Sequence, residues 1–207
     1  MNWPTSTLKR LTASLYYNFF WIPGRPRGAR HDKKPMSFWL IVISTIIMSL
    51  MFGVFFATTG YSVFFGAPFL PTDKRNVDFM IALSGLKPGD RFADLGSGDG
   101  RLVIAAAKAG AKAEGWEINP YLWLISKLRI AFSGVGKNAK VHLGSYWWEN
   151  FKGVDAVSLY LIHIQMPRME KKLQAELAPG ARVVSHVFKF PTWQPVEKRG
   201  AVYLYQR

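Results

Sequence analysis

The chain has 207 residues, of which 49% are hydrophobic, and it carries a formal net charge of +14. It contains no cysteine, which excludes disulfide bonds, thiol catalysis and a cysteine-based zinc site. The length suits one domain of ordinary size with an added segment, and the positive charge suits a partner with anionic groups, either lipid or nucleic acid.

Residues 1–35 are expected to form a basic, aromatic arm beside a membrane. Residues 11–22 are apolar and aromatic but too short to cross a bilayer, which favours a helix lying in the interface. Residues 23–35 are rich in proline, glycine and basic side chains, which is typical of a linker that contacts anionic lipid. A disordered, solvated arm is the alternative.

Residues 36–60 are predicted to be a transmembrane segment. Within them, residues 38–57 carry no charge, and a span of about 20 apolar residues is what a helix needs to cross the hydrocarbon core. No charged side chain occurs anywhere from residue 36 through residue 72. A cleaved signal peptide does not fit, because the preceding segment is far too long for its leading region. Residues 61–70 are then an apolar connector.

A second domain is expected over residues 71–207. Residues 76–86 predict a helix, and residues 92–95 predict a short buried strand that runs into a turn with glycine at positions 96, 98 and 100. Residues 102–109 continue as a helix. This order of strand, glycine turn and helix begins a nucleotide-binding βαβ unit, in which the missing side chains let a ligand approach the backbone.

Acidic side chains at this turn favour a cationic ligand. Asp94 precedes the turn and Asp99 lies within it, so a pyrophosphate would be repelled, whereas a sulfonium or amino group would not. The glycine spacing also differs from the G-x-G-x-x-G pattern of dinucleotide sites. Glu117 follows Asp94 by 23 residues at the end of a strand-like run, where an acid suits two ribose hydroxyls. The predicted cofactor is therefore S-adenosylmethionine (SAM), rather than NAD or ATP.

The remaining segments complete an α/β pattern. Asn119 is a good N-cap and Pro120 a good first residue for a helix that continues to residue 132. Further strands are expected at residues 113–116, 139–143, 155–161 and 181–185, a helix at 166–177, and a terminal hairpin at 196–198 and 202–206. The expected fold is a Rossmann-like sheet of seven strands with helices on both faces, preceded by the transmembrane helix.

The chain resembles the class I, seven-strand SAM-dependent methyltransferases. It is most similar to the membrane-associated protein-lysine methyltransferases that modify adenine nucleotide translocase and the c-ring protein of ATP synthase, and to their prokaryotic relatives. The matching stretches lie within residues 71–207 and are Pro71-Thr72, residues 94–101, Glu117-x-Asn119-Pro120, residues 179–185 and residues 191–196. The last of these, Pro-Thr-Trp-Gln-Pro-Val, is the most telling because it is rare and has no use as generic core.

The resemblance implies a set of cofactor-binding residues around the glycine turn. They are Thr72, Asp94, Gly96, Ser97, Gly98, Gly100, Glu117, Asn119, Ser145 and Trp147. Thr72 is included because the helix before the first strand closes over the cofactor in this family. Many relatives carry an acid near position 145 that accepts a hydrogen bond from the adenine amino group, whereas this chain has serine. Trp147 either stacks on adenine or packs in the core.

Methyl transfer requires the donor carbon and the nucleophile to be held in line about 3–3.5 Å apart with water excluded. A lysine nucleophile must first lose its proton, and an aromatic channel lowers an amine pKa by desolvation. Tyr160 and Trp193 are therefore expected to shape the acceptor slot, with Tyr160 also hydrogen-bonding the amine. His163 either relays the proton or is structural. Nucleic-acid amino methyltransferases usually place Asn/Asp-Pro-Pro-Tyr/Phe after the fourth strand, and its absence here argues against base methylation.

The leading hypothesis is a membrane-anchored SAM-dependent methyltransferase that modifies a lysine of a membrane or membrane-adjacent protein and uses no metal. The alternatives are methylation of a small molecule, lipid or quinone precursor, and a SAM-binding membrane protein without activity. RNA methylation is not favoured, in spite of the positive charge.

The expected location is the SAM-containing, cytoplasmic side of a bacterial inner membrane, or the mitochondrial inner membrane of a eukaryote. Basic residues before the span favour the opposite orientation. An exception to the charge rule, a re-entrant segment, or a partial return through residues 61–70 would each remove this conflict.

Overall fold

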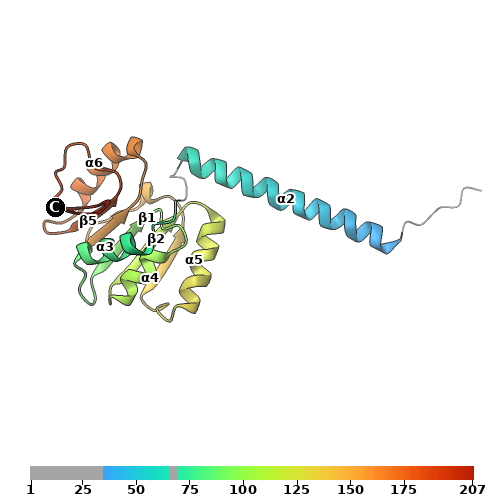
Figure 1. The fold of residues 1–207 in the computed structure, drawn as a ribbon, viewed down its shortest axis with the longest axis horizontal. Coiled ribbons are helices and arrows are strands. Elements are labelled where there is room, and N and C mark those ends of the chain that lie inside the picture. The colour runs from blue at the N-terminus through green and yellow to red at the C-terminus, as the bar shows by residue number, and fades with distance from the viewer. Residues whose placement is uncertain (1–34, 66–69) are drawn as a thin grey trace, which may run out of the picture. The chain divides into compact units, whose positions relative to one another are not determined.

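The computed structural model describes residues 35–65 and 70–207 (Figure 1). All but the last residue of the expected arm at residues 1–35, including its interfacial helix at 11–22, lies outside the described residues. The chain divides into two compact units, residues 1–48 and 49–207. The division falls inside the first described helix.

That helix, α2 (Met36–Phe65), is apolar on every side. Two of its hydroxyl groups are satisfied within the helix, because Ser44 Oγ and Thr45 Oγ1 both donate to the carbonyl of Ile41 at 2.8 Å. Among the described helices, α2 alone is long and apolar enough to cross a membrane, over Met36–Ala57, and none of that stretch is buried. The helix runs past residue 60 to Phe65, so residues 61–65 prolong it.

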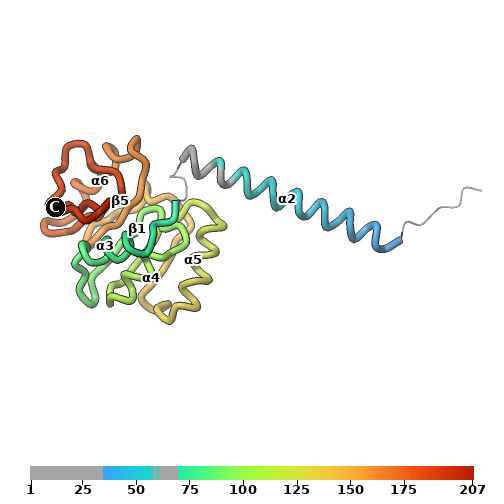
Figure 2. The backbone as a smooth tube through the Cα atoms, in the orientation of Figure 1, coloured from blue at the N-terminus to red at the C-terminus, as the bar shows by residue number. Residues whose placement is uncertain are grey.

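A seven-stranded sheet forms the centre of the second unit, and Figure 2 traces its backbone. The strands are β1 (Arg91–Leu95), β2 (Lys112–Glu117), β3 (Ala139–Leu143), β4 (Ala156–Leu159), β5 (Arg182–His186), β6 (Glu197–Arg199) and β7 (Val202–Gln206). Their order is β3-β2-β1-β4-β5-β7-β6, with β1 to β5 parallel and β7 antiparallel to β5 and β6. The strand order reverses at β1, and ligands bind beyond the carboxyl ends of parallel strands at such a point.

Helices cover both faces of this sheet, and the alternation of side chains along the strands divides the core between them. The helices are α3 (Lys74–Ser84), α4 (Arg101–Lys108), α5 (Pro120–Phe132) and α6 (Met166–Glu176), with short 3₁₀ turns η1 (Tyr146–Trp148) and η2 (His163–Gln165). Phe92 packs with Val103 of α4 and Ile130 of α5, whereas the next residue, Ala93, joins Met169 of α6. The predicted seven-strand Rossmann-like fold is confirmed.

Several elements begin or end differently from the prediction, each for a local reason. The first domain helix starts at Lys74 because Asp73 caps it, accepting from Asn76 N at 3.0 Å, and it stops at the left-handed Gly85. The fourth strand ends at Leu159, two residues earlier than expected, so Tyr160 leaves the sheet. In the hairpin, β6 extends to Arg199 and the turn falls at Gly200.

Candidate active site

The glycine turn joins β1 to α4 in a backbone conformation that side chains disfavour. Gly96, Gly98 and Gly100 have φ of 81°, 55° and 76°, all in the left-handed region. The amides of Gly96 and Ser97 both donate to the carbonyl of Trp116 at 3.0 Å, which ties the turn to β2. A Cβ on Gly100 would lie 2.2 Å from Ser126 Oγ, whereas one on Gly96 would meet nothing within 4 Å. Gly96 is thus the exposed position at which a ligand can approach the backbone.

Ser97 does not point toward that open side. A Cβ on Gly115 of β2 would lie 2.8 Å from Ser97 Oγ, so this hydroxyl sits beneath the turn, against the strand. The amide of Ser97 holds the turn to β2, and its side chain lies against that strand. The role of Ser97 in cofactor binding stays a prediction, and its hydroxyl lies beneath the turn.

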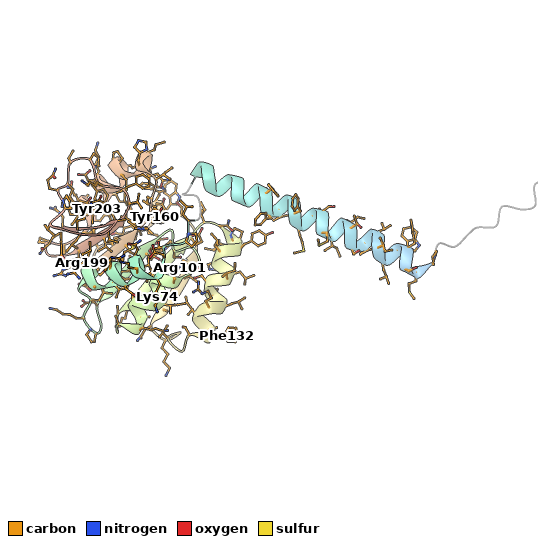
Figure 3. The ribbon with its side chains drawn as sticks, viewed as in Figure 1. Lys74, Arg101, Phe132, Tyr160, Arg199 and Tyr203 are labelled. Atoms are coloured by element: carbon orange, nitrogen blue, oxygen red, sulfur yellow. The ribbon has the colours of Figure 1, made fainter. Side chains whose placement is uncertain are left out.

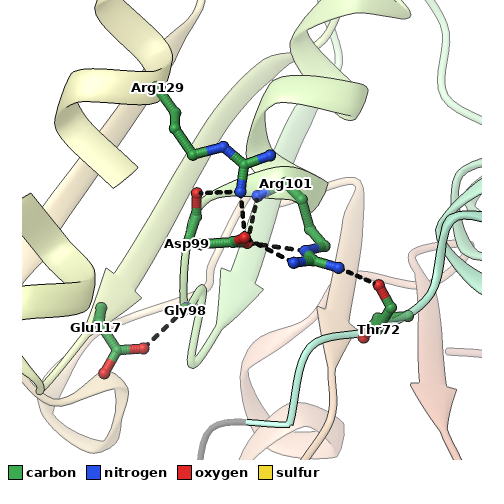
Figure 4. Close-up of polar contacts among 6 residues, drawn as sticks. All are labelled: Thr72, Gly98, Asp99, Arg101, Glu117 and Arg129. Atoms are coloured by element: carbon green, nitrogen blue, oxygen red, sulfur yellow. Dashed lines mark hydrogen bonds and ion pairs between the residues drawn. The ribbon is translucent and has the colours of Figure 1, made fainter. Parts of the chain in front are cut away.

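Glu117 braces the turn from β2. Its two carboxylate oxygens accept from Gly98 N and Asn119 N, each at 2.8 Å, as Figure 4 shows for Gly98. Burial raises the pKa of Glu117, and these backbone amides oppose the rise. Asn119 caps α5 through its side chain, which accepts from Tyr121 N at 2.9 Å. Glu117 thus sets the spacing between the turn and the start of α5. The remaining lone pairs of its carboxylate are available to hydroxyl donors.

Asp94 is a second buried acid, at the end of β1. It is 3% exposed, and Ser158 of β4 donates to its Oδ1 at 2.6 Å. Burial raises the pKa of Asp94 to about 7, the Ser158 hydrogen bond opposes the rise, and the nearby Glu117 and Asp99 add to it. A cation at this end of the sheet would relieve that cost, which agrees with a sulfonium or ammonium ligand.

Asp99 has a different environment, because two arginines neutralise it. Arg101 donates to both of its carboxylate oxygens, from Nε at 2.9 Å and Nη2 at 2.7 Å, and Arg129 of α5 contacts it as well (Figure 4). Burial alone would raise the pKa of Asp99, but hydrogen bonds and charges from the arginines hold it below its usual value. Arg101 also donates to the carbonyl of the buried Thr72. Asp99 therefore joins three segments and is not free to attract a cation.

Ser145 and Trp147 follow the carboxyl end of β3, beside the Glu117 end of β2. Leu143 pairs with Glu117 in the sheet, and Gly144 N donates to the Glu117 carbonyl at 3.0 Å. Ser145 caps η1 by accepting from Trp147 N at 3.4 Å. The guanidinium of Arg168 lies 4.3 Å from the centre of the Trp147 ring, so one face of that indole is occupied by a cation.

Of the three residues predicted for the acceptor side, Tyr160 and Trp193 are partly buried and His163 is exposed. Tyr160 follows β4, and its ring centre lies 4.4 Å from that of His186, the last residue of β5. His163, in contrast, is exposed on η2. The half-buried Trp193 packs on Phe190 and Tyr205, with both pairs of ring centres 5.5 Å apart. Its loop is tied down where Thr192 Oγ1 donates to the buried Glu170 at 2.5 Å.

Three features of this site were missed by sequence reasoning. His186 directly follows the predicted fifth strand, and the rule that ligands bind beyond carboxyl ends was enough to find it. The pairing of Ser158 with Asp94 depends on strand neighbours 64 residues apart in sequence, which the pattern alone does not give. The arginines on Asp99 likewise come from two separate helices. Within residues 35–65 and 70–207, no group of three or more metal-ligating side chains is present.

The residues around the turn fit SAM. The open position at Gly96, the braced carboxylate of Glu117 and the uncompensated Asp94 offer room, a hydroxyl acceptor and a negative potential, respectively. The chain has no cysteine, and two arginines neutralise the charge of Asp99, so neither feature conflicts with such a ligand.

Comparisons with known proteins agree with this geometry. The family model of the ANTKMT methyltransferase domain matches residues 94–197. The lysine N-methyltransferase of the ATP synthase c-ring protein in Rattus norvegicus is 35% identical over 179 residues, which cover 84% of this chain and 82% of that protein. The adenine nucleotide translocase lysine N-methyltransferase of Mus musculus is 39% identical over 130 residues, or 62% of this chain and 56% of that one.

A solved structure is similar as well. The RNA methyltransferase from Salinibacter ruber, crystallised with S-adenosyl-L-homocysteine, superposes with a TM-score of 0.64 at 33% sequence identity. The match covers 66% of this chain and 93% of that one.

Proposed function

The chain belongs to the ANTKMT methyltransferase family and is a SAM-dependent methyltransferase, and from this premise we propose that it methylates a lysine side chain of a membrane or membrane-adjacent protein. The observation that carries the proposal is the similarity to the rat ATP synthase lysine N-methyltransferase over most of both chains. The family is one of protein-lysine methyltransferases; the nature and place of the substrate are what we add.

The site residues have distinct tasks in this proposal. SAM, when bound, supplies a methyl group activated by a sulfonium charge. Asp94 and Glu117 provide the negative potential and the hydroxyl acceptor that would hold it, and Gly96 leaves the space. Tyr160 and Trp193 line the acceptor side and exclude water. The protein's contribution is positioning, which is the larger part of catalysis in an in-line displacement.

Membrane attachment through α2 is the second part of the proposal. The support is the length and uniform apolarity of Met36–Ala57. A further support comes from α5, whose exposed side includes Leu124, Leu128 and Phe132, the last 89% exposed and projecting from the end of the helix (Figure 3). Apolar side chains with this spacing suit the surface of a bilayer. We place the methyltransferase unit on the cytoplasmic side, where SAM is available.

Labelling of native membranes tests the proposed function. The full chain in lipid nanodiscs is incubated with tritiated SAM and membranes of its own source, with Glu117→Ala as the inactive control. We expect label in a polypeptide and, by mass spectrometry, on a lysine. Label that appears instead in an organic extract would establish the small-molecule or lipid alternative, and SAM binding without transfer would establish the non-catalytic one.

RNA methylation is the second candidate, favoured by the similarity to an enzyme described as an RNA methyltransferase and by the net charge of +14. Against it, β4 is followed by Tyr160-Leu161-Ile162 rather than by an Asn/Asp-Pro-Pro-Tyr/Phe segment. Adding total RNA to the same labelling reaction distinguishes the two. Label in the nuclease-sensitive fraction alone would replace the lysine proposal.

A further inference from the structure

His186 occupies the place in the sheet where an acceptor would meet the cofactor. It is the last residue of β5, and β5 pairs with β4, whose end leads into Tyr160. His186 is 6% exposed, and its ring centre is 4.4 Å from that of Tyr160 in an edge-to-face arrangement. The pair lies at the carboxyl ends of two strands that adjoin the glycine turn through β1.

The Nδ1 atom of His186 has no hydrogen-bond partner among the described residues, although it is closed off from solvent. Two serine hydroxyls, Ser97 Oγ and Ser126 Oγ, share this property, and both lie against glycines of the turn region. A hydroxyl can rotate toward a weak acceptor, whereas the ring nitrogen has a fixed direction. A buried polar atom without a partner is unfavourable, so a native protein is expected to supply one in some state.

The backbone is strained at Val187, directly after His186. Val187 has φ of 70°, which a β-branched residue rarely adopts, and Phe188 N donates back to the His186 carbonyl at 2.9 Å. The turn is held from outside, because Val187 N donates to Ala201 O at 2.7 Å and Ser185 Oγ donates to Phe188 O at 2.6 Å. Such strain persists where surrounding contacts impose it, and it is concentrated at ligand sites.

The charges around His186 suit an amine. Burial lowers its pKa, which keeps the ring neutral and able to accept a hydrogen bond, and Asp73 opposes that shift. The titratable groups that face it are Asp73, the N-cap of α3, and Tyr160 after β4. Asp73 follows Thr72, which Arg101 holds beside the glycine turn. The surroundings of His186 thus include one negative charge and one aromatic ring, beside its own neutral acceptor nitrogen.

We propose that His186, Tyr160 and Asp73 form the subsite for the primary amine of the acceptor, in which Nδ1 of His186 accepts an N–H of the incoming lysine. The inference rests on the proposed function and names the residues that receive its substrate. Asp73 attracts the ammonium form, and the half-exposed ring of Tyr160 turns aside so that the amine reaches Nδ1. The ammonium gives one proton to solvent, its nitrogen then bonds to the methyl carbon, the carbon–sulfur bond breaks, and the electron pair stays on sulfur.

Nitrogen NMR of the full chain in detergent micelles, with ¹⁵N-labelled histidine and S-adenosylhomocysteine present, tests the subsite directly. The probe is n-butylamine, and the control is butyltrimethylammonium, which has the charge but no N–H. We expect the His186 Nδ1 signal to move with the amine only, while His142 and His163 stay unchanged. A titration in which His186 does not respond, or responds equally to both compounds, overturns the proposal.

Variants supply the kinetic test on the lysine substrate identified by membrane labelling. His186→Phe keeps a flat ring without an acceptor, and His186→Gln restores an acceptor. We expect the first to raise KM for the acceptor about tenfold with an unchanged Kd for SAM, and the second to recover most of the loss. His142→Phe, at an exposed histidine of β3, is the control. Wild-type activity on lysine with no effect of His186→Phe overturns this inference alone, whereas no lysine labelling by the wild type overturns the proposed function.

Discussion

Two kinds of acidic environment lie within a few residues of each other at the glycine turn. Asp99 is held by Arg101 and Arg129, and its pKa is low in spite of burial. Asp94 is buried without a cationic partner and has a pKa raised to about 7, and burial also raises the pKa of Glu117. The difference shows that the number of acidic residues in a motif does not give its net charge, because nearby basic residues can neutralise some of them. Asp99 is neutralised within the fold, whereas Asp94 and Glu117 are buried and have raised pKa values.

This distinction changes the electrostatic argument for SAM. Asp99 contributes little to cation attraction, because its arginines cancel its charge locally. The negative potential comes from Asp94 and Glu117, which lie on adjacent strands β1 and β2. Asp99 has a different role, since Arg101 links it to Thr72 and so holds the segment before α3 beside the turn.

The largest effect is expected from Glu117→Ala. This change leaves Gly98 N and Asn119 N without their acceptor, so both the turn and the start of α5 lose their brace. The two ribose hydroxyls of SAM also lose their charged acceptor, and because a hydrogen bond to a charged group contributes about 1.5–3 kcal/mol, affinity for SAM should fall at least about 100-fold. Isothermal titration calorimetry measures the loss.

Glu117→Gln serves as the control for this change. It keeps one acceptor oxygen and the size of the side chain, so its loss should be intermediate. Equal affinity of the Ala variant and the wild type would show that Glu117 does not belong to the cofactor site.

Asp94→Asn should raise the stability of the ligand-free fold and lower the affinity for SAM. The raised pKa means that ionised Asp94 destabilises the ligand-free fold, and this penalty grows as pH rises from about 4 through about 7. At pH 8 its size is on the order of 4 kcal/mol, so the Asn variant should melt at a higher temperature there and at nearly the same temperature at pH 4. Its affinity for SAM should fall about tenfold, since the cation loses a negative partner.

Proton release gives a second measure of the same carboxylate. A bound cation lowers the pKa of Asp94, so wild-type SAM affinity should rise with pH up to about 7 and calorimetric heats near pH 6.5 should depend on the buffer's ionisation enthalpy. The Asn variant should lose that dependence. If it persists in the variant, another group carries the proton.

Patterns along the chain were enough to predict most of the fold. The cap at Asn119 with Pro120 placed α5, and the strand at residues 139–143 was predicted at its observed limits. Capping residues and strand patterns involve residues that are close in sequence, so they can be recognised from the sequence alone. The seven-strand sheet and the family also agreed with the sequence motifs.

The partners of the acids could not be predicted in the same way. Arg129 and Ser158 reach Asp99 and Asp94 across 30 and 64 residues, and only the packing of α5 and the pairing of β1 with β4 bring them together. His163 was predicted either to relay the proton or to be structural, because it follows the end of the fourth strand, and the structure shows it exposed on η2. In space, Tyr160 lies instead against His186 from the neighbouring strand. Long-range neighbours decide which acid is neutralised and which histidine lies against Tyr160.

Asp99→Asn should reduce the stability of the fold more than the affinity for SAM. Removing the charge leaves Arg101 and Arg129 facing each other without their shared anion. Because these arginines are partly exposed, we expect a loss of about 1 kcal/mol in unfolding free energy and about a threefold rise in Kd for SAM through looser placement of Thr72. Chemical denaturation and calorimetry measure the two effects. A loss of binding as large as that of Glu117→Ala would remove the distinction between the two environments.

The smallest change is expected from Ser145→Asp, which adds an acid at the end of β3. Aspartate can still cap η1 in place of the serine hydroxyl, so the fold should be unchanged. Position 145 is partly exposed, and solvent screens the new charge, so affinity for SAM should improve only about two- to threefold. Competition with adenosine separates the causes, because adenosine carries the adenine amino group without the sulfonium. A gain for both ligands indicates a hydrogen bond to adenine, and a gain for SAM alone indicates added negative potential of the kind that Asp94 supplies.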